Sequence, residues 1–396
     1  MSGRINLLAP EIRANPYPAY AELRRHAPVS QVDPGGIWAV SRQEDVMHIF
    51  KNPQLFSSQG FRQAYRPPWI SNYPLADSAL VMDPPRHTQL RALINRAFGT
   101  QVVTRIEPRV REFAQRIVQG LHDGQEVNFV EHFSVLMPMY VIGELLGLSP
   151  DVQPRLLHWV EWLGQFTGVG PADTERQEAV RATVNEARGH FEQVLAERRR
   201  NPGDDLISDL LRARVEGESL SDTDLLGFMF LLLVGGMETT IHLLSHSALR
   251  LQLQPELMQQ LRAQPSLLPR FIDEVLRHET PAHGVMRLTS EETELGGVRL
   301  PKGTRLLMLM GSANRDEAQH PDPDRFDMNR PSSNLPFGHG IHFCIGSQLA
   351  RLEARLSLEA LLSRFTHLTA GTQPVQWNSS LVVRGPSRLP LIPHEG

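Results

Sequence analysis

A single cysteine lies in a glycine-rich stretch near the C-terminal end of the chain. The stretch 337–346 reads Phe-Gly-His-Gly-Ile-His-Phe-Cys-Ile-Gly and contains Cys344. Glycine lets the backbone approach a large flat ligand and adopt φ angles that other residues avoid. Leu349, Leu352 and Leu356 then recur at helical spacing, which predicts a helix after this stretch. Cys344 therefore precedes a helix N-terminus, where unpaired N–H groups and the helix dipole favour a thiolate.

A thiolate in a glycine-lined, apolar surrounding is a suitable ligand for a heme iron. A buried structural cysteine is the commoner case in general, but it leaves the glycines and His342 unexplained. A zinc site built from His339, His342 and Cys344 lacks a fourth ligand, because the chain has one cysteine. For the same reason no internal disulfide is possible.

An acid and an alcohol lie in the middle of a long apolar segment. Ser221 and Asp224 predict the start of a helix that runs to about residue 253, a length of about 45 Å. Glu238 and Thr239 follow one another in it. Taken alone, Thr239 is interpreted as a helix threonine whose hydroxyl bonds to its own backbone.

Two adjacent glycines precede this pair. Gly235 and Gly236 each cost a helix interior roughly 1 kcal/mol relative to alanine. They indicate either a close contact with another helix or space for a flat ligand or a helix distortion. The sequence alone leaves both readings open.

The composition is that of an ordinary globular protein. The 396 residues are 41% hydrophobic and 21% charged, with a formal net charge of -4, so nucleic-acid binding has no support. Residues 1–10 lack the pattern of a signal peptide, and the most apolar run, 225–234, is short of the ~20 residues that span a bilayer. We expect a cytoplasmic protein with no membrane segment. His242 and His246 lack the glutamate of a zinc-protease motif and are interpreted as packing residues.

Helical signals dominate the rest of the chain. Ser41 and Glu44 predict a capping box, Asp83 and Pro84 the start of another helix, and 172–200 a long amphipathic helix on the outside of the fold. Short strands are predicted at 37–40, 298–300 and 305–308, and irregular coil at 321–336. Helices are therefore many and strands few.

The stretch 337–346 resembles the heme-binding loop of the cytochrome P450 family, with phenylalanine, glycine, a basic residue and the cysteine in register. Further matches are spread over nearly the whole chain. The resemblance implies a mainly α cytochrome P450 fold, in which residues 1–396 form a single domain with a small β-rich region. It also implies heme b, buried between the long central helix and the helix after the cysteine loop, with Cys344 as the iron ligand.

The resemblance assigns roles to further residues. Those expected around the heme are His87, Arg91, Arg287 and His342 at the propionates, and Gly235, Phe337, Gly338 and Gly346 beside the ring. Glu238 and Thr239 match the family's acid–alcohol pair, which implies that they relay protons. Glu274 and Arg277, three apart on one helix face, match a buried charge network in which Arg325 is the expected third member.

The activity implied is monooxygenation of a bulky apolar substrate, with O2 and electrons from NAD(P)H through an external ferredoxin and its reductase. Substrate classes consistent with this are a macrolide or other polyketide, a terpenoid, a steroid or a fatty acid. By family analogy the substrate pocket uses Phe61, Trp69, Ile70, Leu231, Val234, His283, Val285, Leu381 and Val382. Arg62, Arg66 and His283 are candidates to contact a polar group of the substrate, and Arg86, Arg96, Arg351 and Arg355 to contact the ferredoxin. We expect a monomer. The alternatives are a heme-binding carrier or sensor without turnover and a peroxide-driven variant.

Overall fold

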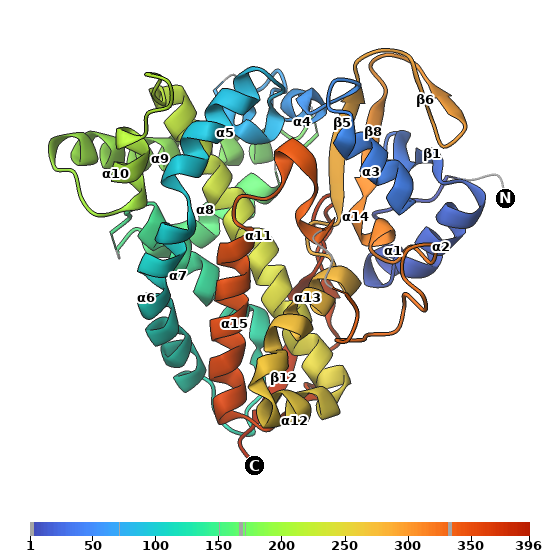
Figure 1. The fold of residues 1–396 in the computed structure, drawn as a ribbon. Coiled ribbons are helices and arrows are strands. Elements are labelled where there is room, and N and C mark those ends of the chain that lie inside the picture. The colour runs from blue at the N-terminus through green and yellow to red at the C-terminus, as the bar shows by residue number, and fades with distance from the viewer. Residues whose placement is uncertain (1–3, 71, 150, 166–168, 171, 332–334) are drawn as a thin grey trace. The chain divides into compact units, whose positions relative to one another are not determined.

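The computed structural model describes residues 4–70, 72–149, 151–165, 169–170, 172–331 and 335–396 (Figure 1). The chain forms two compact units. Unit 1 comprises Met1–Ser57, Arg109–Met137 and Thr239–Gly396, and unit 2 comprises Ser58–Pro108 and Pro138–Glu238. The expectation of a single domain stays a prediction.

Helices hold most of the described chain. The α-helices are α1 Pro10–Ala14, α2 Tyr17–His26, α3 Gln43–Lys51, α4 Gln59–Ala64, α5 Arg86–Ala97, α6 Thr100–Gln119, α7 Leu136–Leu145, α8 Gln153–Gln165, α9 Thr174–Arg200, α10 Leu206–Arg212, α11 Asp222–Leu253, α12 Pro255–Ala263, α13 Leu268–His278, α14 Met310–Ala313 and α15 Ser347–Arg364. Short helical turns are η1 Pro74–Asp77, η2 Ala79–Val81, η3 Val130–Ser134, η5 Pro265–Leu267, η6 Leu335–Phe337 and η7 Gly340–His342.

The described strands form small sheets, all of them in unit 1. The largest has the order β1-β2-β8-β5-β3, with β1 Val29–Val32, β2 Ile37–Val40, β8 Arg305–Leu309, β5 Gly284–Thr289 and β3 Phe56–Ser57. β2 and β8 are parallel, and the other neighbours are antiparallel. A second sheet has the order β4-β12-β9, with β4 Val127–Asn128, β12 Pro390–His394 and β9 His367–Ala370. Two further sheets have two strands each: β10 Gln376–Trp377 with β11 Pro386–Arg388, and β6 Thr293–Leu295 with β7 Val298–Leu300. The three predicted strands are confirmed.

The long apolar helix begins with the capping residues that the sequence predicts. Asp224 Oδ2 accepts from the Ser221 backbone N–H at 2.9 Å, and the Ser221 hydroxyl accepts from the Asp224 N–H at 3.2 Å. This reciprocal pair satisfies two of the unpaired N–H groups at the helix start. α11 is also the helix, among the described residues, that is long and apolar enough to cross a membrane, but 67% of its most apolar window is buried inside the protein.

The predicted capping box at Ser41 is wrong. The Ser41 hydroxyl donates to the Pro28 carbonyl at 3.2 Å, and no side chain of its own segment caps α3. Asp316, far along the chain, accepts from the N–H of Gln43 at 2.8 Å instead. The carboxylate that accepts from the helix N-terminus thus comes from a distant segment rather than from the local capping box.

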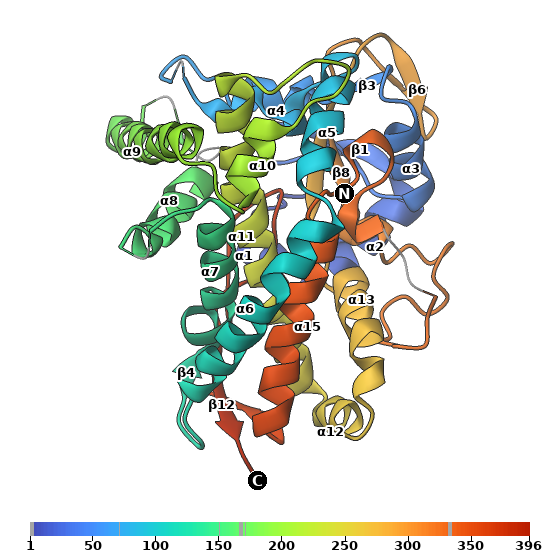
Figure 2. The ribbon, with the colours of Figure 1, turned by 60° about the vertical axis from the view of Figure 1, so that its left-hand side comes forward.

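The helix predicted at 172–200 is confirmed as α9, capped by the Asp173 side chain, which accepts from the Arg176 N–H. One face of α9 buries residues such as Val180, Val184 and Phe191, and its neighbour in unit 2 is α8 (Figure 2). The helix expected from Asp83 begins at Arg86. The described part of 321–336 is irregular up to 331 and ends in η6, while 332–334 lie outside the described residues.

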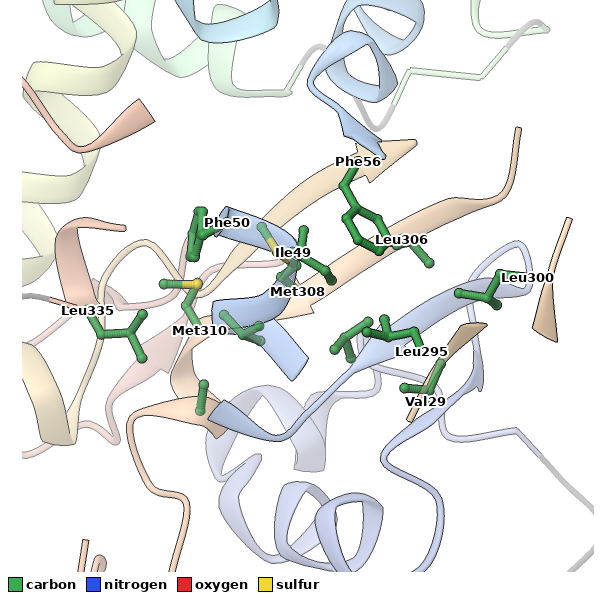
Figure 3. Packing of buried hydrophobic residues seen from close by; sticks show 13 residues of the cluster. Val29, Ile49, Phe50, Phe56, Leu295, Leu300, Leu306, Met308, Met310 and Leu335 are labelled. Atoms are coloured by element: carbon green, nitrogen blue, oxygen red, sulfur yellow. The ribbon is translucent and has the colours of Figure 1, made fainter. Parts of the chain in front are cut away.

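A hydrophobic cluster in unit 1 joins α3 to the largest sheet (Figure 3). Ile49 and Phe50 come from α3, Leu306 and Met308 from β8, and Leu335 from the segment before the cysteine loop. All of them are buried. This packing fixes Phe50, at the end of α3, in the position from which it contacts the cysteine loop.

Candidate functional site

The cysteine loop of unit 1 is held at both ends by backbone hydrogen bonds. The Cys344 N–H donates to the Phe337 carbonyl at 3.0 Å, and the N–H of Ser347, the first residue of α15, donates to the Cys344 carbonyl at 3.4 Å. Cys344 itself is exposed. The loop therefore presents a sulfur atom at a helix N-terminus, as the sequence predicts.

Two glycines give this loop its shape. Gly338 and Gly340 have φ angles of +76° and +69°, in the left-handed region that favours glycine. A Cβ on Gly340 would lie 3.0 Å from the Phe50 carbonyl oxygen, so the loop lies directly against the end of α3. At Gly346, a Cβ would meet the Cys344 sulfur at 3.9 Å, an ordinary contact.

Phe50 also connects the loop to a buried cation. The guanidinium carbon of Arg287, on β5, lies 5.9 Å from the centroid of the Phe50 ring, and the Arg287 side chain is buried. One nitrogen of Arg287 donates to the Met286 carbonyl at 2.8 Å. His342, in η7, is half-buried. Sequence reasoning missed Phe50, because nothing in its local pattern indicates contacts with residues nearly 300 positions away.

These residues fit a heme. The donor is the sulfur of an exposed cysteine, and the backbone before it has a glycine, Gly340, where a Cβ would press on α3. A buried arginine in the same unit suits a propionate carboxylate, because a buried anion needs a cation or N–H donors. His87 and Arg91 lie four apart on α5, in unit 2, where His87 is buried and Arg91 is half-buried.

The two adjacent glycines of α11 have different surroundings. A Cβ on Gly236 would lie 2.6 Å from Ile142 Cδ1, on α7, so this glycine permits a close helix–helix contact. A Cβ on Gly235 would meet only the Leu231 side chain of its own helix, at 3.8 Å. Gly236 therefore permits the close helix contact, and Gly235 is the position with space for a ligand.

Glu238 lies where α11 faces α8 within unit 2. A Cβ on Gly164, of α8, would lie 3.6 Å from Glu238 Oε2, an ordinary contact, so the carboxyl group lies next to α8. Burial raises the pKa of Glu238 to about 7. Both protonation states are then populated near neutral pH, which suits a group that accepts and releases protons. Thr239, the next residue of the helix, is half-buried.

The buried network around Glu274 has a different third arginine from the one predicted. Arg277 donates to both Glu274 oxygens at 2.8 and 2.7 Å, and both side chains are buried. Arg330 lies 3.6 Å from Glu274 and is 11% exposed. Arg325 is 63% exposed, and its side chain pairs with Asp327.

The prediction that the Arg325 side chain joins this network is therefore wrong. Its backbone carbonyl does so instead, accepting from Arg277 at 3.3 Å. In an irregular coil a shift of a few residues moves a side chain from the interior to solvent. The sequence signal for Arg330 was only a second arginine in the same coil.

An aromatic row in unit 2 contains part of the expected substrate pocket. Phe61 stacks on Tyr65 with ring centroids 6.1 Å apart, Tyr65 meets Tyr73 edge to face at 5.6 Å, and Tyr73 meets Phe230 of α11 at 6.0 Å. Ile70 is buried, while Trp69, Leu231 and Val234 are half-buried. Ser71, inside this segment, lies outside the described residues.

The expected pocket residues of unit 1 come from two segments that meet. The N–H groups of His283 and Gly284 both donate to the Val382 carbonyl, at 2.8 and 3.1 Å. A Cβ on Gly284 would lie 2.6 Å from the Leu381 carbonyl oxygen. Val285 is half-buried against the hydrophobic cluster of Figure 3. The structure therefore brings Val285, Leu381 and Val382 into one region.

His283 does not have the predicted role of contacting a substrate polar group. Its ring is buried, packs against Tyr20 at 5.5 Å between centroids, and would collide with a Cβ on Gly311 at 2.1 Å. Burial holds the pKa of His283 well below its usual value, so the ring is neutral. The side chain points into the interior of unit 1, where glycine at 311 makes room for it.

His242 and His246 are packing residues, as predicted. Both are buried, and His246 Nε2 lies 3.0 Å from the Arg384 carbonyl oxygen. Burial lowers the pKa of His242 to about 3 and that of His246 to about 4. Within the part of the chain that the structure describes, no group of three or more His, Cys, Asp or Glu side chains is placed to hold a metal ion.

Comparisons with known proteins agree with this chemistry. The family model described as Cytochrome P450 matches residues 158–392. The solved structure of "Cytochrome P450 CYP109Q5 from Chondromyces apiculatus" is 38% identical in sequence and has a TM-score of 0.92. The match covers 100% of this chain and 100% of that structure's chain. This likeness confirms the predicted mainly α cytochrome P450 fold.

Curated relatives match over almost the whole length. "Cytochrome P450 109" of Bacillus spizizenii is 35% identical over 388 residues, which is 96% of this chain and 92% of the relative. "Mycinamicin IV hydroxylase/epoxidase" of Micromonospora griseorubida is 35% identical over 385 residues, which is 94% of each chain.

Proposed function

The chain belongs to the cytochrome P450 family, as a soluble member of the bacterial type, and on that premise we propose that it transfers one oxygen atom of O2 to a C–H or C=C bond of a bulky apolar small molecule. Members of this family are heme-thiolate monooxygenases that take electrons from an external redox partner. For a hydroxylation, substrate, O2, two electrons and two protons are consumed, and the alcohol and water are released.

The observation that carries this proposal is the position of Cys344. Its sulfur is exposed before α15, beside glycines that keep the loop open and in the same unit as the buried Arg287. Cys344 would hold the iron, and Arg287 with His342 would bind propionate. When bound, the heme supplies activation of O2, which thiolate ligation promotes. Phe337, Gly338 and Gly346 would border the ring.

Residues of unit 2 would complete the heme and proton functions. His87 and Arg91 would bind propionate, and Gly235 would leave space for the ring. Glu238 would take protons from solvent, because its pKa of about 7 lets it give them up again at neutral pH. Thr239, the next residue of the helix, would pass them on through its hydroxyl group.

The substrate class rests on the aromatic row and on the relatives. Phe61, Tyr65 and Tyr73 form a cluster of buried aromatic rings, and aromatic side chains are typical of sites for large apolar ligands. A relative of similar length is named a hydroxylase/epoxidase of mycinamicin IV. We propose a secondary metabolite of comparable bulk, a polyketide, terpenoid or steroid, or a fatty acid, as the substrate.

We propose a ferredoxin, reduced by NAD(P)H through its reductase, as the electron donor, and a monomeric enzyme in the cytoplasm. Arg351 and Arg355 of α15 are about 30% exposed and are the candidates in unit 1 for contact with an acidic partner. Both already pair with carboxylates, Asp273 and Glu359, at 2.9 and 3.0 Å. In unit 2, Arg86 pairs with Asp224 and Arg96 is exposed.

The test is the absorption spectrum of the purified, reduced protein with carbon monoxide. We expect a strongly red-shifted Soret band that is lost in Cys344→Ala and kept in Gln348→Ala, an exposed position of α15, the helix that follows the cysteine loop. An unshifted band in the wild type would contradict thiolate ligation. Substrate-dependent product formation with ferredoxin and reductase would then separate a monooxygenase from a heme carrier or sensor. Product formed with hydrogen peroxide alone would indicate the peroxide-driven variant.

A further inference from the structure

Two arginines of the aromatic segment share one carboxylate. Asp77 Oδ1, at the end of η1, accepts from Arg66 at 2.6 Å and from Arg62 at 3.2 Å. Arg62 Nε also donates to the Ala76 carbonyl at 3.2 Å. Asp77 is 28% exposed, so the junction is partly shielded from solvent. Arg62 and Arg66, whose side chains are 37% and 46% exposed, are thus already paired with a carboxylate of the protein itself.

The backbone that carries Asp77 is seated on the central helix. A Cβ on Gly227, of α11, would lie 3.0 Å from the Asp77 carbonyl oxygen and 3.3 Å from the Pro74 carbonyl oxygen. One turn further along α11, Phe230 contacts the ring of Tyr73. Contacts of backbone and ring on both sides of η1 therefore hold Asp77 in place, so its carboxylate is pre-organised for the arginines.

The junction belongs to the same segment as the proposed substrate surface. Arg62 follows Phe61, and Arg66 follows Tyr65, the two stacked rings of the aromatic row. On α11, the helical spacing places Gly227, Leu231 and Val234 on one face, which continues to Glu238. A ligand lying along this face would have the arginine junction towards one end and Glu238 towards the other.

The carboxylates along this face oppose an anionic ligand. Asp77 neutralises one of the two guanidinium charges, and it already accepts hydrogen bonds from both groups. A ligand carboxylate would have to compete for these donors with an internal carboxylate that is already in position.

We propose that Asp77 sets the charge specificity of the enzyme: as an internal carboxylate it occupies the guanidinium pair of Arg62 and Arg66, so that the site takes neutral apolar substrates and rejects carboxylates. This inference rests on the proposed function and narrows its substrate class, because it separates neutral polyketides, terpenoids and steroids from free fatty acids.

The test compares two ligands with the same acyl chain, the anion laurate and its neutral methyl ester, by calorimetric titration of the heme-loaded protein at pH 7.5. The wild type should bind the ester more tightly. Asp77→Asn should strengthen laurate binding by about tenfold, as expected for a new charge-assisted contact, and leave ester binding within about twofold. Asp77→Glu, which keeps the carboxylate, should keep the wild-type preference.

Two further variants separate charge from structural damage. Arg62→Gln/Arg66→Gln/Asp77→Asn removes the same carboxylate together with both cations and should restore the preference for the ester. Asp209→Asn is the matched control, because Asp209 is also 28% exposed and also pairs with two arginines, Arg105 and Arg212.

The proposal is overturned if the wild type binds laurate as tightly as the ester, if it binds no ester, or if Asp77→Asn leaves the ratio unchanged. The carbon monoxide spectrum of the same samples reports on the proposed function separately. A normal spectrum with an unchanged ratio would reject the role of Asp77 alone, whereas an absent thiolate band would reject the proposed function.

Discussion

Gly236 of α11 lies so close to Ile142 of α7 that a Cβ built on the glycine would fall 2.6 Å from Ile142 Cδ1 and 3.3 Å from Cγ1. Gly235, its neighbour in sequence, would meet nothing but a side chain of its own helix at 3.8 Å. Of two glycines that look equivalent in the sequence, Gly236 permits a close contact between helices, whereas Gly235 leaves space beside α11.

Alanine at these two positions should have opposite effects on stability. Gly236→Ala overpacks the contact with Ile142 and should lower the free energy of unfolding by about 1–3 kcal/mol. Gly235→Ala should raise the free energy of unfolding of the heme-free protein by roughly 0.5–1 kcal/mol, because alanine favours the helix. The same variant should lower the heme content, because its methyl group takes space proposed for the ring. Urea denaturation and heme absorbance measure both. Equal effects of the two variants on stability would contradict the distinction.

The acid of the proposed proton path should make stability depend on pH. Burial raises the pKa of Glu238 from 4.5 to about 7, so between these pH values the folded state binds more protons than the unfolded state. Its contribution to stability is full below about 4.5 and is lost as the pH rises through about 7. Glu238→Gln stays neutral and should therefore gain stability relative to the wild type at pH 8 but not at pH 4.5. Denaturation of both proteins at the two pH values measures this, and a difference that does not change with pH would argue against it.

The buried network predicts that the Glu274–Arg277 pair contributes to stability and that the Arg325 side chain does not. Glu274→Ala leaves the buried Arg277 without its carboxylate and should cost about 3–5 kcal/mol of unfolding free energy. Arg325→Ala, at a side chain that is 63% exposed, should change it by less than about 0.5 kcal/mol. Chemical denaturation of both variants measures the difference. A large loss in Arg325→Ala would restore the role that the sequence assigned to it.

Thr239 should act on coupling rather than on binding. Thr239→Ala removes the hydroxyl group next to Glu238, so electrons from NAD(P)H should be consumed with less product, while the carbon monoxide spectrum stays unchanged. Thr239→Ser keeps the hydroxyl and should restore most of the yield of product per NAD(P)H. Unchanged coupling in Thr239→Ala would remove the proposed role and leave the residue as a helix threonine bonded to its own backbone.

Much of the fold followed from short-range patterns. The helix that begins at Asp222 is set by its capping residues, and the helix that begins at Ser347 is set by apolar residues a few positions apart. The loop of Cys344 was recognisable because its residue types lie within ten positions of one another. The family and its reaction class rest on such local signals, and the comparisons confirm both.

The tertiary structure decided which residues meet across long distances in the chain. It puts Arg330 rather than Arg325 beside Glu274, and it turns His283 into the interior of unit 1. It caps α3 with Asp316 rather than with Ser41.

Local spacing could not have predicted these pairings. Asp77 lies more than ten residues after each of its two arginines. Its backbone is held in place by contact with Gly227 of α11, about 150 residues further along the chain. By itself the sequence determined the chemistry that the chain carries, because ligand type and helix periodicity are local properties. Partners, burial and pKa depend on packing between distant segments, and only the folded structure decides them.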